Sequence, residues 1–386
     1  MQQPPIQSTP VGAFRFNTDS SKLEYYDGNQ WVNITTDSPE RHTGGAFGVY
    51  MGGSGTTDRI DGVQISTGGD SFDFGNLTVS RNNNGDGGMA SRVRGFFAQG
   101  QSPITGRIEY VNFASGGTTS NAGDAIVFGT MQSNITNGAC SASDSTRGLL
   151  FGGYAAPTSL NDIQYITMAS TGNAKDFGDL SVTGQSSAFS SPTRAIGVHN
   201  GSNTMSYVTI STLGNAADFG DSTWAGGHRA WGSNAIRGVA FGGELQPSGA
   251  KTNIIEFATI ATLGNAIDFG DSTVTGTHRA WGSNAIRGVN FGGEDSGGSK
   301  KDIMEYATIA TLGNALDFGD TISAIAEGST MTSETRAVHC GGNSPSATNV
   351  IQYVQIMTTG DSRDFGDLTI ARGHGDACSN AHGGLG

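Results

Sequence analysis

The stretch that decides the fold occurs twice, almost unchanged: HRAWGSNAIRGVAFGG at 228–243 and HRAWGSNAIRGVNFGG at 278–293. The two copies differ at one position and begin 50 residues apart. A repeat of this length is typical of a unit that stacks or closes on copies of itself, because one such unit cannot bury both of its faces alone. We therefore expect related units along the rest of the chain.

A second marker, Asp-Phe-Gly-Asp or a close variant, sets the number of units. Its phenylalanine recurs at intervals of 42 to 54 residues, at Phe74, Phe128, Phe177, Phe219, Phe269, Phe318 and Phe365. Most copies also have an apolar stretch ending in Gly-Gly, as at 149–153, an alternating stretch, as at 163–168, and a Gly-Asn turn, as at 172–173. Alternation rich in β-branched and aromatic residues predicts strands, and Gly and Asn tolerate the positive φ of turns. The chain is therefore predicted to be all-β, with about four short strands per copy.

The seven copies also predict ring closure. Gly48 and Gly384 occupy the same place in the repeat and lie 336 residues apart, which is seven times 48. The chain thus stops where its first copy began, whereas an open solenoid needs atypical repeats at its ends. Four-stranded units in a closed ring form a β-propeller. We predict a seven-bladed β-propeller of four-stranded blades over 45–386, preceded by a separate segment over 1–44.

The repeat resembles that of kelch propellers, which is about 50 residues long. The resemblance lies in the Gly-Gly after an apolar strand and in an aromatic residue in the next strand, at Tyr165, Phe257, Tyr306 and Tyr353. A second aromatic follows a dozen residues later. In this chain it is the phenylalanine of the Asp-Phe-Gly-Asp motif, where kelch repeats usually carry tryptophan. The resemblance implies a kelch-like propeller.

We expect the recurring motifs to serve packing. The motif phenylalanine should pack blade against blade, and its aspartates should accept backbone N–H bonds in turns; calcium binding is the alternative. His228, His278 and His374 share one repeat position, nine residues after that phenylalanine. Because equivalent positions lie around a ring, we do not expect these histidines to converge on a metal, and we predict no cofactor.

Composition excludes several classes of protein. The chain has 34 acidic and 21 basic residues, a net charge of −13, whereas a nucleic-acid-binding surface is basic. No stretch approaches the roughly 20 apolar residues of a membrane span, and the first residues show no signal peptide. Three cysteines do not suggest a disulfide framework. We predict no nucleic-acid binding and no membrane insertion.

Residues 1–44 lie outside the repeat and contain Asp27-Gly28, a hairpin signal. The segment resembles an element of bacteriophage tail-fibre and appendage proteins through Gly12, Arg15-Phe16-Asn17, Leu23-Glu24, Tyr26-Asp27-Gly28 and Trp31. So small a sheet is marginal alone, so it packs either on the propeller or on another chain. Its predicted docking residues are Phe14, Phe16, Tyr25, Tyr26 and Trp31.

Binding is better supported by the sequence than catalysis. Loops on a rigid propeller suit recognition, and Trp and Arg are frequent contact residues. The predicted ligand-binding residues are Trp224, His228, Arg229, Trp231, His278, Arg279 and Trp281. The alternative for Trp231 and Trp281 is packing between outer strands. No catalytic residue is predicted, because neither a nucleophile motif nor a placed carboxylate pair is evident.

The repeats and the N-terminal segment together resemble tail-fibre-like proteins of phages that infect marine and freshwater bacteria. The resemblance implies a non-enzymatic virion structural protein, a tail fibre or other appendage, assembled in the host cytoplasm and located on the tail or capsid surface. The N-terminal element would bind other virion proteins, and the propeller would bind a host-surface glycan or receptor; a homo-oligomer is compatible with this role. The alternatives are a glycan-acting enzyme on a propeller scaffold and a cellular kelch-like adaptor.

Overall fold

The computed structural model describes residues 10–17, 22–33, 47–82, 88–98, 100, 106–115, 123–135, 138–184 and 186–381. The chain divides into two compact units, Met1–Arg41 and His42–Gly386. The described residues form strands and one 3₁₀ turn, Phe113–Ser115, and none of their helices is long and apolar enough to cross a membrane. Two features of the sequence prediction, the boundary between 44 and 45 and Gly384, lie outside the described residues.

The larger unit contains seven antiparallel sheets, which we number as blades in chain order. Six have four strands; blade 5 has a fifth, because its two-residue strand β19 also pairs with β21. Blade 1 comprises β4 (Phe47–Met51), β5 (Thr57–Gln64), β6 (Phe72–Arg81) and β32 (Asp376–Ser379); blade 2, β7 (Gly88–Ala90), β8 (Arg94–Phe97), β9 (Arg107–Asn112) and β10 (Ile126–Thr130); blade 3, β11 (Cys140–Ser143), β12 (Arg147–Ala155), β13 (Thr158–Thr167) and β14 (Lys175–Asp179).

The remaining blades follow the same order. Blade 4 comprises β15 (Ser186–Ser190), β16 (Arg194–His199), β17 (Thr204–Thr209) and β18 (Ala217–Asp221); blade 5, β19 (Gly226–Gly227), β20 (Ala230–Ser233), β21 (Arg237–Leu245), β22 (Lys251–Thr259) and β23 (Ile267–Asp271); blade 6, β24 (Ala280–Ser283), β25 (Arg287–Phe291), β26 (Lys301–Thr308) and β27 (Leu316–Ile325); blade 7, β28 (Ser329–Thr332), β29 (Arg336–Cys340), β30 (Val350–Gln355) and β31 (Arg363–Asp367).

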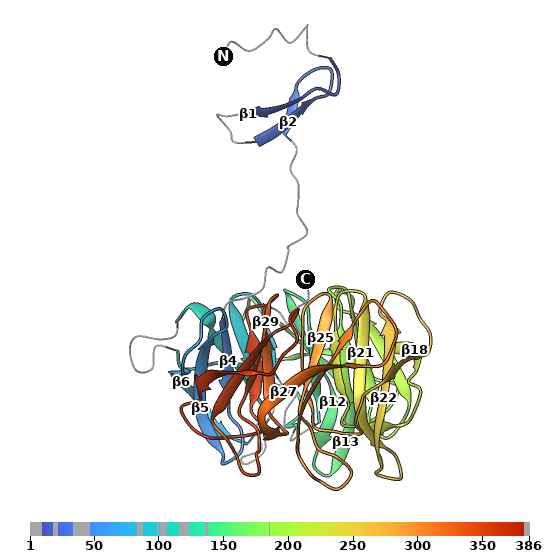
Figure 1. Ribbon diagram of the computed structural model, residues 1–386. Helices are drawn as coiled ribbons and strands as arrows, with labels where there is room; N and C mark the ends of the chain where they lie inside the picture. Colours follow the sequence, from blue (N-terminus) through green and yellow to red (C-terminus); the bar gives the residue numbers. More distant parts are fainter. Residues whose placement is uncertain are drawn as a thin grey trace. The chain divides into compact units, whose positions relative to one another are not determined.

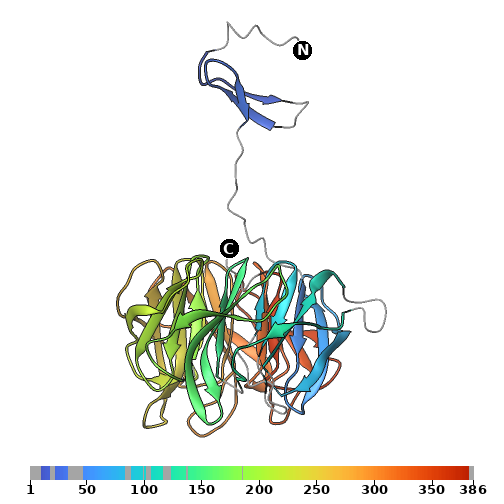
Figure 2. The same cartoon turned by 180° about the vertical axis from the view of Figure 1, so that it is seen from behind.

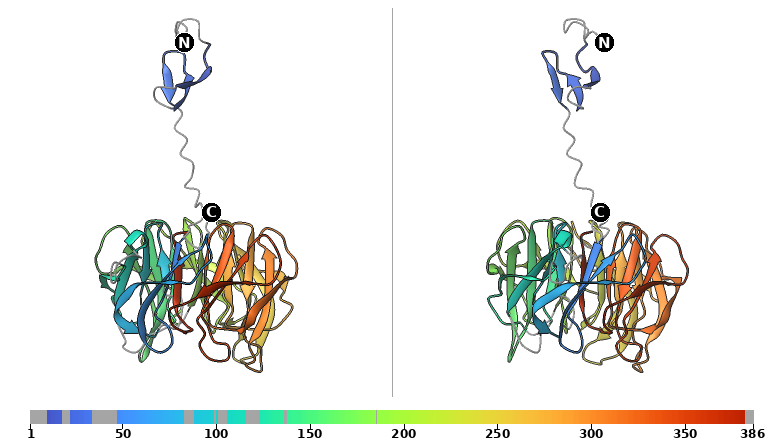
Figure 3. Two further views of the ribbon diagram at one scale, coloured as in Figure 1. Left: turned by 60° about the vertical axis from the view of Figure 1, so that its left-hand side comes forward. Right: turned by 90° about the vertical axis from the view of Figure 1, so that its left-hand side faces the viewer.

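The ring closes in blade 1, where the last strand of the chain pairs with an early one. β32 runs antiparallel to β4, with Asp376 opposite Met51 and Ser379 opposite Gly48, and Figure 1 shows the blue strands of this blade beside red ones. The innermost strands of neighbouring blades contact one another around the whole ring. In order they are β7, β11, β15, β20, β24, β28 and β32, and β32 contacts β7. In Figures 2 and 3 the ribbon colours, which run along the sequence, change from blade to blade around the ring. The predicted seven-bladed propeller is confirmed.

The Asp-Phe-Gly-Asp strand fastens each blade to the next one. In blade 3, Phe177 is buried among residues of blades 3 and 4, and its carbonyl accepts the N–H of Gly214 in the next blade at 2.8 Å. A Cβ on Gly178 would collide with the backbone of Gly214, so the motif requires glycine there. Matching bonds reach the carbonyls of Phe128, Phe219, Phe269, Phe318 and Phe365. The predicted role of this phenylalanine in blade packing is confirmed.

The first aspartate of the motif makes a local bond within its strand, and a recurring arginine adds a bond to the next blade. Asp218 Oδ1 accepts the Gly220 N–H at 3.2 Å, and three other copies make the same bond, as predicted for the first aspartate of the motif. At the start of β12, Arg147 lies over the ring of Tyr165 at 5.1 Å, and its Nη1 donates to Ile210 O of blade 4 at 2.8 Å. Arg94, Arg194, Arg237, Arg287 and Arg336 do the same in their blades.

The N-terminal unit is a three-stranded antiparallel sheet of β1 (Phe14–Asn17), β2 (Lys22–Tyr26) and β3 (Trp31–Asn33). Phe14 pairs with Tyr25 and Phe16 with Leu23, so these four side chains share one face, because side chains alternate along strands. Phe14 and Phe16 are 67% and 62% exposed. On the opposite face, Arg15 Nε contacts Glu24 Oε2 at 2.7 Å, and the guanidinium group lies 4.2 Å from the centre of the Trp31 ring. The sheet therefore has one packed face and one uncovered apolar face within its own unit.

Candidate functional site

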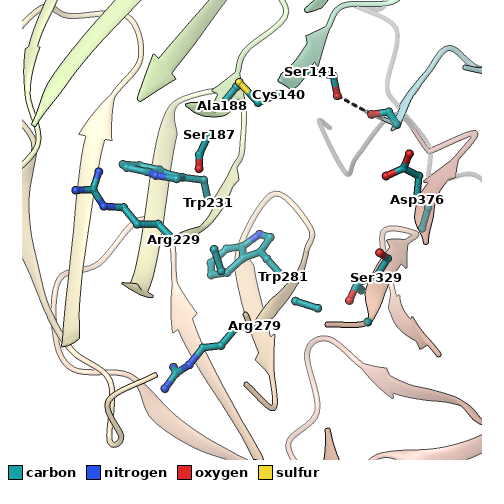
Figure 4. A pocket seen from close by; sticks show the side chains of 16 residues that line it. Cys140, Ser141, Ser187, Ala188, Arg229, Trp231, Arg279, Trp281, Ser329 and Asp376 are labelled. Atoms are coloured by element: carbon teal, nitrogen blue, oxygen red, sulfur yellow. Dashed lines mark hydrogen bonds between the residues drawn. The ribbon is translucent and has the colours of Figure 1, made fainter. Parts of the chain in front are cut away.

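The innermost strands of the seven blades surround a cavity of about 310 Å³ in the propeller unit. Each of these strands contributes residues to its lining, including Gly88 and Ser141, Ala188 and Trp231, and Trp281, Thr330 and Ala377. Figure 4 shows the two tryptophans side by side, with serine hydroxyl groups and Asp376 across the opening. A second hollow of about 240 Å³ has the same seven residues in its lining. The cavity is therefore small, and its lining is mostly hydroxyl-bearing, aromatic and small residues.

Packing on one side holds each tryptophan in place. Trp231 stacks on Phe189 with ring centres 4.5 Å apart and an angle of 15° between the planes. Trp281 lies 5.2 Å from Phe241, and a Cβ on Gly232 would collide with its ring. Both indole Nε1 atoms are buried and lack a hydrogen-bond acceptor in the described structure. The remaining surface of both rings faces a cavity able to admit a small ligand.

The position of these tryptophans corrects one sequence-based alternative. The alternative to ligand binding was that these tryptophans pack between outer strands. Trp231 and Trp281 instead lie on β20 and β24, the innermost strands of their blades. The segment after each Asp-Phe-Gly-Asp strand crosses to the innermost position of the next blade. Local alternation predicts a strand but does not assign it to a blade, so the sequence alone placed it wrongly.

Arg229 and Arg279 have acidic partners within the protein. Arg279 Nη1 lies 3.1 Å from Glu305 Oε2 and Arg229 Nη1 lies 3.8 Å from Glu256 Oε1, and all four side chains are buried. Figure 4 shows both guanidinium groups directed away from the tryptophans. Burial lowers the pKa of Arg229 to about 10, because a charged group is poorly solvated there.

Two further buried pairs join Arg81 to Glu109 and Arg372 to Asp61. Trp224 is also engaged inside the protein, since Arg229 lies 3.9 Å from the centre of its ring. The predicted binding set is therefore divided by the structure. Trp231 and Trp281 line the cavity. Arg229 and Arg279 also line it, but their guanidinium groups are paired with buried carboxylates. Trp224 is not among the lining residues.

The histidines at the shared repeat position lie closer together than expected. The rings of His228 and His278 are 5.0 Å apart, and His374 Nε2 lies 3.3 Å from Glu327 Oε2. Glu327 occupies the same repeat position, nine residues after Phe318. Neighbouring blades meet at these turns, so adjacent members of this series lie close to one another. Of the three histidines, His278 alone belongs to a cluster of possible metal ligands among the described residues.

Two other histidines and all three cysteines lie inside the propeller. Burial lowers the pKa of His339, which stacks on Phe291, to about 4, and it does the same for His199. Cys140, Cys340 and Cys378 are buried, and burial raises the pKa of the Cys340 and Cys378 thiols well above their usual range. The two histidines and these two thiols therefore stay neutral in the folded protein near pH 7.

No family model and no curated protein sequence matches the chain. Among solved structures 547 chains match it. One of them, titled "Structure of YjhT", superposes with a TM-score of 0.57 over 74% of this chain and 97% of that chain, at 10% sequence identity. At this identity the likeness concerns the fold alone, and it agrees with the propeller described above.

Proposed function

We propose that the chain is a non-enzymatic structural protein of a bacteriophage particle, with a kelch-like propeller that binds a host-surface glycan and an N-terminal sheet that binds another virion protein. The observation that carries the binding role is the pair Trp231 and Trp281 in the lining of the central cavity. The phage assignment is supported by the resemblance of residues 12–31 to the appendage element and of the repeats to tail-fibre-like proteins.

The chemistry of the cavity suits a sugar. An indole offers a flat apolar surface, and a sugar ring has an apolar face bordered by hydroxyl groups. Ser187 and Thr330 add hydroxyl groups that can donate and accept. The cavity volume of about 310 Å³ is at the lower end of the range for small-molecule sites, roughly 300–1,000 Å³. The cavity therefore favours the end of a glycan chain or a short branch.

The same lining favours binding over hydrolysis. Glycoside hydrolysis ordinarily uses two carboxyl groups that flank the scissile bond. Of the described residues that line the cavity, Asp376 alone carries a carboxylate. A propeller that holds the sugar against aromatic rings without a second acid binds it without cleaving it.

The uncovered face of the N-terminal sheet supports the docking role. Of the five predicted docking residues, Phe14, Phe16 and Tyr25 lie on the uncovered face. Tyr26 and Trp31 pack against each other, with ring centres 5.5 Å apart. We therefore assign docking to the first three residues and internal support of the sheet to the other two.

Binding by the purified full chain to host-surface polysaccharide tests the propeller's role. Trp231→Phe and Trp281→Phe each replace the indole with a smaller ring and so remove aromatic surface from the cavity wall. We expect each to weaken binding about 10-fold, or roughly 1.4 kcal/mol. Trp224→Phe is the matched control, because Trp224 does not line the cavity, and its affinity should not change. Unaltered binding by both cavity variants would refute the site, and shortened polysaccharide chains would favour the enzyme.

Mass spectrometry of purified phage particles tests the assignment to a virion. We expect the chain at a fixed copy number per particle, together with the major structural proteins. Its absence from purified particles would overturn the proposal, whatever the propeller binds.

A further inference from the structure

Three side chains bring metal-binding atoms together at the junction of blades 6 and 7. His278, Glu294 and Glu327 each offer one ligand atom, and these atoms all lie within 4.8 Å of one another. His278 is in the turn before β24, Glu294 follows β25, and Glu327 is in the turn before β28. None of them lines the central cavity. We infer that these residues form a binding site for a divalent transition metal of the Zn²⁺ type.

The donor atoms are available. His278 Nδ1 is buried and has no hydrogen-bond partner in the described structure. Lys251 contacts only Oε1 of Glu294, at 2.8 Å, while Asn343 and His374 contact Oε2 of Glu327. Each carboxylate therefore keeps a second oxygen that can bind a cation.

The type of donor selects the metal. Zn²⁺ binds both imidazole nitrogen and carboxylate oxygen, and three protein ligands leave a further position for water. Imidazole suits Zn²⁺ and other late transition metals, whereas Ca²⁺ and Mg²⁺ take oxygen ligands. The ring of His228, 5.0 Å from that of His278, places a second imidazole beside the site. The ligand set therefore favours Zn²⁺ over Ca²⁺.

Backbone hydrogen bonds fix the positions of the three ligands. Glu294 and Thr277 exchange two bonds, of 2.9 and 3.1 Å, next to His278. The Glu327 N–H donates to His278 O at 3.2 Å, and the His374 N–H donates to Glu327 O at 2.9 Å. Such contacts around metal ligands hold them in a binding geometry and raise affinity. The site therefore needs side-chain adjustment but no backbone rearrangement to close on an ion.

Electrostatics also favours a bound cation. Two carboxylate groups whose oxygens lie within 4.8 Å repel each other unless positive charge lies between them. Lys251 pairs with Glu294 alone, at 2.8 Å. A divalent ion between the two glutamates would balance both at once.

Blade 5 supplies a matched comparison. Its His228 and Glu244 correspond to His278 and Glu294, since they stand at the same places in the two near-identical repeats. The next turn after His228 carries His278, where the turn after His278 carries Glu327. Blade 5 therefore lacks the second carboxylate, and Glu244→Gln serves as a control that leaves the proposed ligands intact.

The test uses the full chain without an affinity tag, stripped with a chelator and equilibrated with ZnCl₂. Elemental analysis should find close to one Zn²⁺ per chain, and excess Ca²⁺ should not displace it. Glu294→Gln and Glu327→Gln should each weaken Zn²⁺ binding at least 10-fold, because each removes a charged ligand, whereas Glu244→Gln should bind like the unmodified chain. Undiminished binding in both ligand variants, or displacement by Ca²⁺, would overturn the inference.

Cobalt binding gives a second test of the site that uses only the unmodified chain and so does not depend on whether the variants fold. Co²⁺ added to the stripped, unmodified chain should produce visible absorption bands with the intensity of four- or five-coordinate cobalt, and Zn²⁺ should remove them. Spectra identical to those of free Co²⁺ would contradict the site even if both glutamine variants were unfolded.

Discussion

The N-terminal sheet and a propeller blade are both small antiparallel sheets, and they differ in what covers their apolar side chains. In blade 3, Leu149, Phe151 and Phe177 are buried, and Ala195 and Val208 of blade 4 belong to the same core cluster. In the N-terminal sheet, Phe14 and Phe16 are more than half exposed. The same alternating pattern thus produces a core where the unit is repeated in a ring. Where the unit occurs once, the pattern leaves a surface to be covered by something else.

The difference also lies in how the sheets are held at their edges. Each blade is bonded to its neighbour through the Asp-Phe-Gly-Asp strand, and most are also joined by an arginine that donates to a carbonyl of the next blade. The described bonds of the N-terminal sheet are internal to it, such as that between Arg15 and Glu24. The propeller's stability is therefore shared among blades, whereas that of the sheet depends on a covering surface.

The largest effect is expected from a pair of phenylalanine truncations. Phe177→Ala leaves a cavity between two blades and should lower the free energy of unfolding of the propeller by about 3–5 kcal/mol. Phe16→Ala removes an exposed side chain and should change that free energy by less than about 0.5 kcal/mol. Urea unfolding of the full chain, followed through the propeller transition, gives both numbers. Equal losses would show that the exposed face is part of the propeller's core.

Acid should also separate the two units, by a smaller amount for each group that titrates. His199 and His339 are neutral in the folded propeller, with pKa values lowered to about 4, whereas residues 1–41 contain no histidine. Because the unfolded chain takes up these protons near pH 6.5, propeller stability is complete above that pH. It falls as the pH drops towards 4, by roughly 3 kcal/mol per histidine at 1.36 kcal/mol per pKa unit.

Urea unfolding between pH 7 and 4 measures this dependence. His339→Gln cannot be protonated and should reduce the slope, even if it lowers stability at pH 7. A slope that is unchanged in His339→Gln would mean that this histidine does not contribute to acid sensitivity.

The fold was largely predictable because its determinants are local and recur seven times. The motif phenylalanine marks the same step in every blade, and Gly-Gly ends and Gly-Asn turns mark their steps in most of the blades. The assignment of residues 230–233 to the innermost strand was not predictable, because strand pairing between blades leaves no local pattern. Register along a hairpin is set by its turn, but the pattern does not say which blade the preceding segment joins.

The candidate site was predicted only in part. Trp231 and Trp281 were predicted from their residue type. Arg229 and Arg279 were predicted with them, and both also line the cavity. The sequence analysis did not predict that these two arginines are paired with buried carboxylates. The available signal was Glu256 and Glu305, each an acid within an apolar strand, because a buried carboxylate requires a cation nearby. The ligand cluster was missed because ring symmetry was taken to separate equivalent turns. The recurrence of His, His, Glu and His at 228, 278, 327 and 374 was the signal that pointed to it.

The smallest expected effect on stability tests the uncovered face directly. Phe14→Ser and Phe16→Ser together should leave the propeller transition in place, since both side chains are exposed, yet reduce the number of chains per purified phage particle several-fold. Val11→Ser is the control, because Val11 is 74% exposed but precedes β1. If the double variant is incorporated normally, the apolar face is not the docking surface. Packing of this sheet on the propeller of its own chain would then be the better account of why it is apolar.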